Sequence, residues 1–264
     1  MSVRVADDAG TSTPGRPSLV PHLIGVTIAG GALLRILQVA ADTTQYLGEI
    51  RLARDTDSRS IGRLLTEPLS FGTASSYGYL LAQKFFVGVL GTGDLAHRVF
   101  PLVASLAGLW VFLALARQYL QGPALLFAVA CFSFGVPFII IVAPFKPHGT
   151  VDTAATLGLL LVALHLVRQP LGARAAMRAG LIGFVLLWFA EAATLVAAGV
   201  IVALIVSALL QRAPQRLKSM LPAFTLWAIG GVATVVASYA ASDATMRARC
   251  GTCTPMELCR HFPT

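Results

Sequence analysis

Six side chains are of the types that carry chemistry on hydroxyl and phosphate groups: three acids, two cations and one imidazole. They are Glu49, Asp55, Asp152, Arg35, Lys146 and His148. A carboxylate can take a proton from an attacking hydroxyl, and a cation can bind a lipid-linked phosphate. Lys146, His148 and Asp152 lie close together in the sequence, so they form one compact candidate group. This set predicts a site that handles a phosphorylated substrate and a hydroxyl.

Most of these residues also have a structural interpretation, which the sequence leaves open. Asp55, like its neighbour Asp57, is an acid of the kind that is simply solvated in a long exposed loop. Lys146 lies near a helix end, where a lysine often anchors the helix at the membrane surface. Asp152 fits a helix N-cap, with Thr150 as a rival for that position.

The composition decides which elements must position these side chains. Of the 264 residues, 56% are apolar and 12% are charged, and the mean hydropathy is +0.76. A soluble domain carries about 25% charged residues and cannot bury so much apolar surface. Because the apolar runs are unbroken rather than alternating, they predict membrane helices. The net charge of +8 is then a topology signal, and nothing in the pattern predicts a nucleic-acid partner.

The first span is predicted at residues 23–41, after a polar tail at 1–21. A signal peptide is the competing interpretation, because Val39-Ala40-Ala41 has the form of a cleavage site. The run is long for a signal, however, and acids rather than a basic leader precede it. Arg35 lies about 9 Å below the outer end of this span, so it could extend outward to the surface.

A polar outer loop is predicted at residues 42–98, with two helical patterns inside it at 58–65 and 77–90. The second pattern covers about 21 Å, which is less than the hydrocarbon thickness of about 30 Å. We therefore interpret both as interfacial helices that lie along the membrane. A short span at 77–90 is the alternative.

Five more apolar runs follow, at residues 99–116, 123–143, 151–167, 179–210 and 217–240. The run at 179–210 would form a helix of about 48 Å, too long for one crossing. Arginines precede and follow it, and basic short loops belong in the cytoplasm. Both basic loops can be cytoplasmic only if the run crosses twice, with a turn near Glu191. This predicts an all-α polytopic bundle of about seven transmembrane helices, with the N-terminus in the cytoplasm.

The chain therefore divides into a polar tail at 1–21, a transmembrane module at 22–240 and an irregular tail at 241–264. The last segment carries Cys250, Cys253, Cys259 and His261. A zinc site and an outer disulfide are both compatible with these residue types. We favour a frame-shifted or truncated end, because the cysteine spacing is cramped.

The order of the motifs resembles that of GT-C membrane glycosyltransferases, of the protein O-mannosyltransferase and lipid A aminoarabinose transferase type. The similarity covers about residues 23–240 and rests on motifs that follow the first span in a fixed order. They are Tyr46-Leu47-Gly48-Glu49-Ile50, Ser58-Arg59-Ser60-Ile61-Gly62-Arg63-Leu64-Leu65, Glu67-Pro68-Leu69, Ser76-Tyr77-Gly78-Tyr79-Leu80-Leu81, Leu90-Gly91-Thr92-Gly93-Asp94-Leu95-Ala96-His97-Arg98 and Lys146-Pro147-His148-Gly149-Thr150-Val151-Asp152.

The resemblance implies a seven-helix module with two juxtamembrane helices in the first outer loop. It implies transfer of a sugar from a polyprenyl phosphate to an acceptor hydroxyl outside the cytoplasm, with inversion at the anomeric carbon. The partners would be the lipid-linked sugar, membrane lipid and an acceptor glycan, lipid or protein, in a bacterial inner membrane. No cofactor is assigned, and a divalent metal stays an open alternative.

The resemblance also assigns roles to residues. The family's functional Asp-Glu pair aligns with Gly48-Glu49, so Glu49 is the leading catalytic residue and Asp55 a substitute for the missing acid. The family's Lys-x-Tyr and later Asp align with Lys146, His148 and Asp152, which predicts that Lys146 binds the lipid phosphate. Because Gly48 departs from the pattern, a structural membrane subunit is the main alternative, and a transporter is the third.

Overall fold

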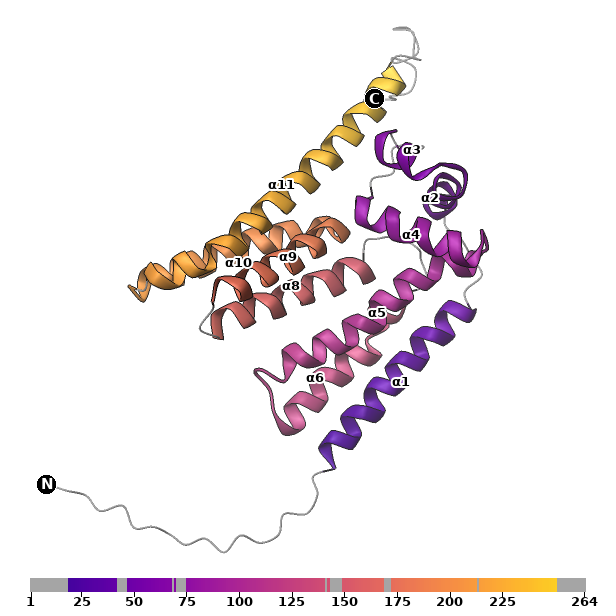
Figure 1. Cartoon of the computed structure of the whole chain (residues 1–264). Coiled ribbons are helices and arrows are strands. Elements are labelled where there is room, and N and C mark those ends of the chain that lie inside the picture. The colour runs from indigo at the N-terminus through magenta and orange to yellow at the C-terminus, as the bar shows by residue number, and fades with distance from the viewer. Residues whose placement is uncertain are drawn as a thin grey trace, which may run out of the picture.

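The computed structural model describes residues 19–41, 47–67, 69, 75–140, 142, 149–168, 172–212 and 214–250. Every regular element in these ranges is a helix (Figure 1). The helices are α1 (Val20–Ala41), α2 (Leu47–Ser58), α3 (Ile61–Thr66), α4 (Tyr77–Leu90), α5 (Asp94–Ala116), α6 (Gly122–Phe134), α7 (Val136–Ile140), α8 (Thr150–Arg168), α9 (Ala173–Phe189), α10 (Glu191–Leu210) and α11 (Pro214–Cys250).

Five of the described helices are long and apolar enough to cross a membrane: α1, α5, α8, α10 and the Leu217–Ala237 part of α11. Large apolar side chains such as Trp110, Phe127 and Leu195 are exposed on the outside of the bundle. Such a surface is stable against lipid tails rather than water. The predicted all-α polytopic membrane bundle is confirmed, and the chain is an integral multi-pass membrane protein.

The long apolar run at 179–210 divides into an antiparallel helix pair. The extended backbone of Ala190 separates α9 from α10, so Glu191 begins the second helix. Trp227 Nε1 donates to the Ala179 carbonyl at 3.2 Å and Thr234 Oγ1 to the Leu187 carbonyl at 3.2 Å, so α11 runs parallel to α9. Since α10 leads from the end of α9 back to the start of α11, the predicted turn near Glu191 is confirmed.

The predicted helix at 123–143 is interrupted. It ends as α6 at Phe134, Gly135 follows, and the short α7 begins at Val136. Pro137 explains the interruption, because it has no N–H to donate to the carbonyl four residues earlier, that of Ser133. The last carbonyls of α6 are therefore left without intrahelical partners inside the bundle.

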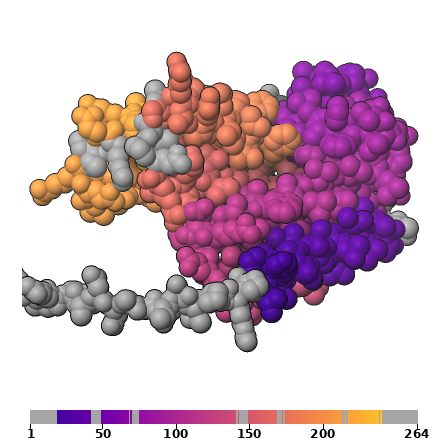
Figure 2. All heavy atoms as spheres, turned by 60° about the horizontal axis from the view of Figure 1, so that its bottom comes forward, coloured from indigo at the N-terminus to yellow at the C-terminus, as the bar shows by residue number. Residues whose placement is uncertain are grey.

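Helices α2, α3 and α4 form a layer over one end of the bundle, and in the space-filling view their purple atoms gather there (Figure 2). Helix α4 has the predicted bounds, and it crosses the end of α5 instead of running beside it (Figure 1). The other predicted interfacial helix is corrected. It begins at Ile61, where the Ser60 side chain accepts from the Arg63 N–H, and a separate helix, α2, precedes it.

Close backbone contact fixes this layer to the bundle. A Cβ atom on Gly78 of α4 would lie 2.6 Å from the Trp188 carbonyl oxygen at the end of α9, so only glycine fits there. Ser76 Oγ donates to the Phe189 carbonyl at 2.8 Å beside it. The layer is therefore held against the α9–α10 turn.

The predicted tails fall largely outside the described residues, as do Cys253, Cys259 and His261. Helix α11 continues to Cys250, so its last residues lie in the segment predicted as a tail.

Candidate functional site

Glu49 lies in the first turn of α2, and only 1% of its surface is exposed. Its charge is close enough to Tyr79 of α4 to act on that hydroxyl: burial raises the pKa of Tyr79, and the Glu49 charge raises it further. An acid in the first turn also interacts favourably with the helix dipole. The leading candidate residue therefore lies at the contact between α2 and α4, at one end of the bundle.

A chain of polar contacts continues from Tyr79 to α5 and back to α2. Gln83 Nε2 donates to the Tyr79 hydroxyl at 2.7 Å and to the His97 carbonyl at 2.8 Å. His97 Nε2 lies 3.1 Å from Asp57 Oδ1, at the end of α2. Lys84 Nζ donates to the Thr56 carbonyl at 2.7 Å. We call the buried residues Glu49, Tyr79, Gln83 and His97, together with the half-buried Asp57, the buried polar cluster.

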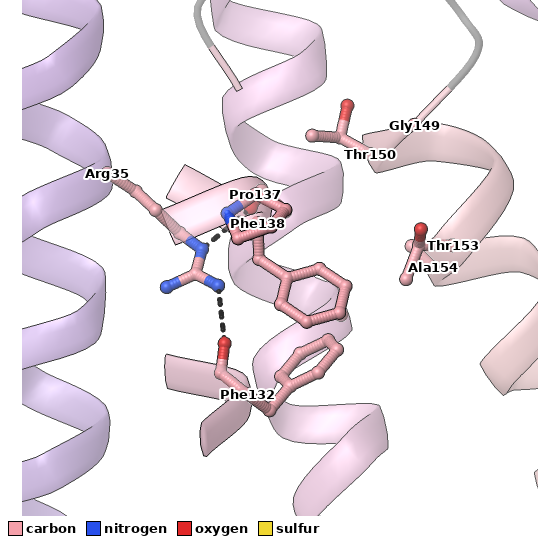
Figure 3. A pocket seen from close by; sticks show the side chains of 10 residues that line it. Arg35, Phe132, Pro137, Phe138, Gly149, Thr150, Thr153 and Ala154 are labelled. Atoms are coloured by element: carbon pink, nitrogen blue, oxygen red, sulfur yellow. Dashed lines mark hydrogen bonds between the residues drawn. The ribbon is translucent and has the colours of Figure 1, made fainter. Parts of the chain in front are cut away.

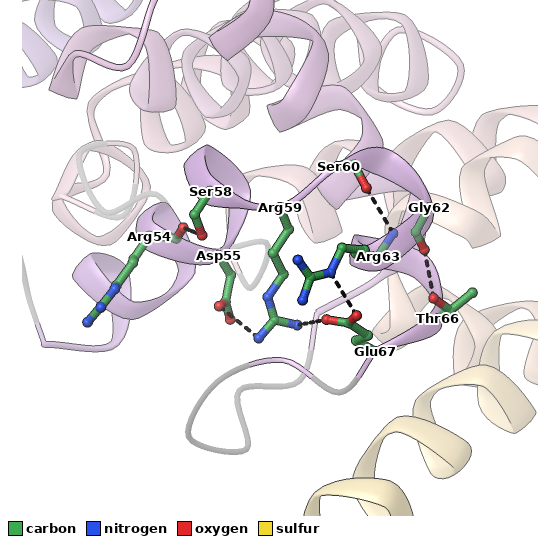
Figure 4. Close-up of polar contacts among 9 residues, drawn as sticks. All are labelled: Arg54, Asp55, Ser58, Arg59, Ser60, Gly62, Arg63, Thr66 and Glu67. Atoms are coloured by element: carbon green, nitrogen blue, oxygen red, sulfur yellow. Dashed lines mark hydrogen bonds and ion pairs between the residues drawn. The ribbon is translucent and has the colours of Figure 1, made fainter.

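Asp55 is 2% exposed and forms an ion pair with Arg59, whose guanidinium lies 3.1 Å from it (Figure 4). Arg59 also approaches Glu67 at 3.9 Å, and Glu67 accepts from Arg63 Nε at 2.8 Å. The Arg63 hydrogen bond lowers the pKa of Glu67. The alternative in which Asp55 is simply solvated is wrong, because its carboxylate is covered and paired.

Arg35 does not extend to the outer surface. It is 1% exposed, and its guanidinium turns sideways to the end of α6 (Figure 3). It donates to the carbonyls of Gly31 at 3.0 Å, Ser133 at 2.8 Å and Phe132 at 3.1 Å, and to Ser105 Oγ at 2.9 Å. The Ser133 carbonyl, which Pro137 leaves without its usual donor, thus accepts from Arg35 instead, and the Phe132 carbonyl beside it does the same. The predicted outward direction of this side chain is wrong, and its role in substrate binding stays a prediction.

Lys146 and His148 lie outside the described residues. Asp152 lies in the first turn of α8 rather than at its N-cap, since α8 begins at Thr150. Its neighbour Val151 packs in one buried cluster with Leu52 of α2 and Tyr79 of α4. The structure therefore brings the start of α8 to the same layer as Glu49.

A small cavity of about 70 Å³ connects Arg35 with the start of α8. Thr150 and Thr153 line it together with Arg35 and Ser105 (Figure 3). Arg35 and the start of α8 thus line the same small cavity, but the structure places Arg35 deeper in the bundle than the layer that carries Glu49.

Sequence reasoning did not select Tyr79, Gln83 or His97. One available signal was the spacing of Glu49, Leu52, Asp55 and Thr56, which places all four on one side of α2. All four are buried. When acids share one side of a helix with an apolar residue, that side is expected to pack against protein, so the acids face protein rather than water.

Chemically, the buried polar cluster places a carboxylate, a phenol that keeps its proton and an imidazole near one another, so each can donate or accept a hydrogen bond at this end of the bundle. In the part of the chain that the structure describes, no group of three or more His, Cys, Asp or Glu side chains is arranged to hold a metal ion.

No protein-family model matches the chain, and no curated protein matches it in sequence.

Proposed function

We propose that this membrane protein is a glycosyltransferase of the GT-C type. It would transfer a sugar from a polyprenyl phosphate to an acceptor hydroxyl on the extracytoplasmic face of its membrane. The observation that carries the proposal is the position of Glu49, a buried carboxylate in a juxtamembrane layer over one end of a helix bundle. A carboxylate at that level can meet the head of a lipid-linked sugar while the polyprenyl tail stays in the bilayer.

Two further observations support the same function. The layer brings the start of α8, with Asp152, to the same end of the bundle as Glu49. The Glu49 charge acts on the buried Tyr79 hydroxyl, which accepts from Gln83, so this carboxylate lies beside a set of held polar groups. Lys146, in the segment just before α8, is proposed to bind the lipid phosphate.

A structural membrane subunit is the second candidate. It is favoured by the ion pair that covers Asp55 and by Gly48, which stands where the resembling family has an acid. In that case the polar clusters stabilise the layer and carry out no reaction.

Transfer assays separate the two candidates. Membranes that contain the full chain should move radiolabel from at least one of polyprenyl-phosphate mannose, glucose and aminoarabinose into lipid or protein, above membranes without the chain. Robust turnover by the purified chain would exclude the structural subunit. Absence of transfer from all three donors, with the protein shown to be folded, would contradict the proposed enzyme.

We further propose that the N-terminus lies in the cytoplasm of a bacterial cell, so that the juxtamembrane layer lies outside. The described basic residues at helix ends opposite the layer support this direction: Arg117, Arg168, Arg174, Arg178, Arg212 and Lys218.

The orientation of the chain in the membrane can be measured with single cysteines introduced into a cysteine-free variant. An impermeant maleimide added to intact cells should label Ser58→Cys, in the layer, and leave Gln215→Cys unlabelled until the cells are opened. Both positions are exposed, so accessibility alone does not bias the result. The reverse pattern would contradict the proposed orientation.

A further inference from the structure

A cavity of about 930 Å³ opens between α8 and α9 at the end of the bundle opposite the juxtamembrane layer. Its polar wall carries Gln118, His165, Arg168, Arg174 and Arg178. No acidic residue is among the described residues that line it. The cavity is therefore large and strongly positive, and neither Glu49 nor the buried polar cluster belongs to it.

The arginines come from two helices and converge on this space. Arg168 ends α8 and is held in place by its donation to Gln118 Oε1 at 2.5 Å and by the Tyr119 ring, whose centroid lies 5.4 Å from its guanidinium carbon. Arg174 and Arg178 are four residues apart in the first turns of α9. The rule that basic loops stay in the cytoplasm requires only positive charge near the helix ends. These three arginines also line the same cavity, which that rule does not require.

Arg174 and Arg178 form no ion pair with any residue that the structure describes. Like charges four residues apart on a helix repel each other. An anion between them would remove that repulsion, and guanidinium groups bind phosphate with two parallel hydrogen bonds.

The other wall of the cavity is apolar. Leu161, Leu164 and Ile182 line it, toward the middle of α8 and α9. A soluble phosphate would leave these side chains without a partner. An amphipathic molecule with a phosphate head and an acyl chain fits both walls, because basic pockets between membrane helices favour anionic lipid head groups.

We propose that this cavity binds an anionic glycerophospholipid of the adjacent leaflet. Its phosphate lies among Arg168, Arg174 and Arg178, and one acyl chain lies along Leu161, Leu164 and Ile182. The bound lipid would join α8 to α9 at the end of the bundle that the juxtamembrane layer does not cover.

The test titrates the purified full chain in an uncharged detergent with dioleoyl phosphatidylglycerol or dioleoyl phosphatidylcholine, and counts bound lipid by native mass spectrometry. The wild type should prefer phosphatidylglycerol. The double variant Arg174→Gln/Arg178→Gln should bind phosphatidylglycerol about 30-fold more weakly, since each cation near the surface contributes about one factor of five to the attraction. It leaves the Arg168–Gln118 contact intact.

Two further variants keep the result interpretable. Arg212→Gln/Lys218→Gln removes the same charge at the same end of the bundle but outside the cavity, so it should bind phosphatidylglycerol like the wild type. Arg174→Lys/Arg178→Lys keeps the charge but not the paired hydrogen bonds, so its binding should lie between those of the wild type and the Gln variant.

Three results would overturn the proposal. The first is equal binding of the two lipids by the wild type. The second is equal loss of phosphatidylglycerol in the cavity variant and the Arg212/Lys218 variant, which would show general attraction to a basic surface. The third is binding of glycerol 3-phosphate as tight as that of the whole lipid, which would assign the cavity to a soluble phosphate.

Discussion

Replacing Glu49 with Gln should lower sugar transfer by a factor of about 10² to 10⁴, the contribution that a positioned general base makes to a reaction rate. The change keeps the shape of the side chain and its place at the contact with α4, but removes the carboxylate that is proposed to accept the proton of the acceptor hydroxyl. The measurement is the initial rate of radiolabel transfer from the polyprenyl-phosphate donor, with donor and acceptor both saturating.

The matched control is Asp94→Asn, which removes an acid at the same end of the bundle. Asp94 is exposed in the first turn of α5, whereas Glu49 is buried. Its transfer rate should stay close to that of the wild type. Full activity in Glu49→Gln would remove Glu49 from the mechanism. Equal loss in both variants would indicate that the charge of this membrane end, and not the buried carboxylate, matters.

Replacing Arg35 with Met should reduce the free energy of unfolding by about 2–4 kcal/mol, because hydrogen bonds from a charged group to buried acceptors contribute strongly and their loss leaves those acceptors unpaired. Four donations end with this substitution, two of them to the last turn of α6. The measurement is reversible unfolding in detergent, followed by circular dichroism.

Further variants test whether the lost hydrogen bonds of Arg35 cause the loss of stability. The free energy of unfolding of Arg35→Lys should be intermediate. Lysine keeps the charge, but its single ammonium lacks the guanidinium fork and cannot reach Ser105, Phe132 and Ser133 together. Arg54→Met, at an exposed position of α2, should have little effect. Hydrogen exchange should rise in the last turn of α6 in Arg35→Met. An unchanged stability and exchange pattern would show that Arg35 is not the partner on which the α6 terminus depends.

Arg35 illustrates what sequence reasoning could and could not predict. A lone arginine in an apolar run predicts either a side chain that reaches the surface or a buried partner. The decision depends on Pro137, about one hundred residues away, which leaves the Ser133 carbonyl without its usual donor. No local pattern around Arg35 contains that information.

The acids of α2 show the same limit. Their position near a membrane end could be predicted from charge and span length. Their spacing on one side of α2 indicated that they face protein, but the surface that they meet could not be predicted. It depends on how α4 crosses the bundle, and that crossing is fixed by Gly78 against the Trp188 carbonyl. His97 and Gln83 joined the cluster for the same reason.

By itself, the sequence determined the solvent and the class of fold. Lipid cannot satisfy backbone hydrogen bonds, so long apolar runs had to become helices, and the basic ends of the 179–210 run required the turn found at Ala190. Only the tertiary structure decided which polar side chains meet. Their partners come from distant helices, and a buried guanidinium or carboxylate takes the orientation that the available hydrogen bonds allow.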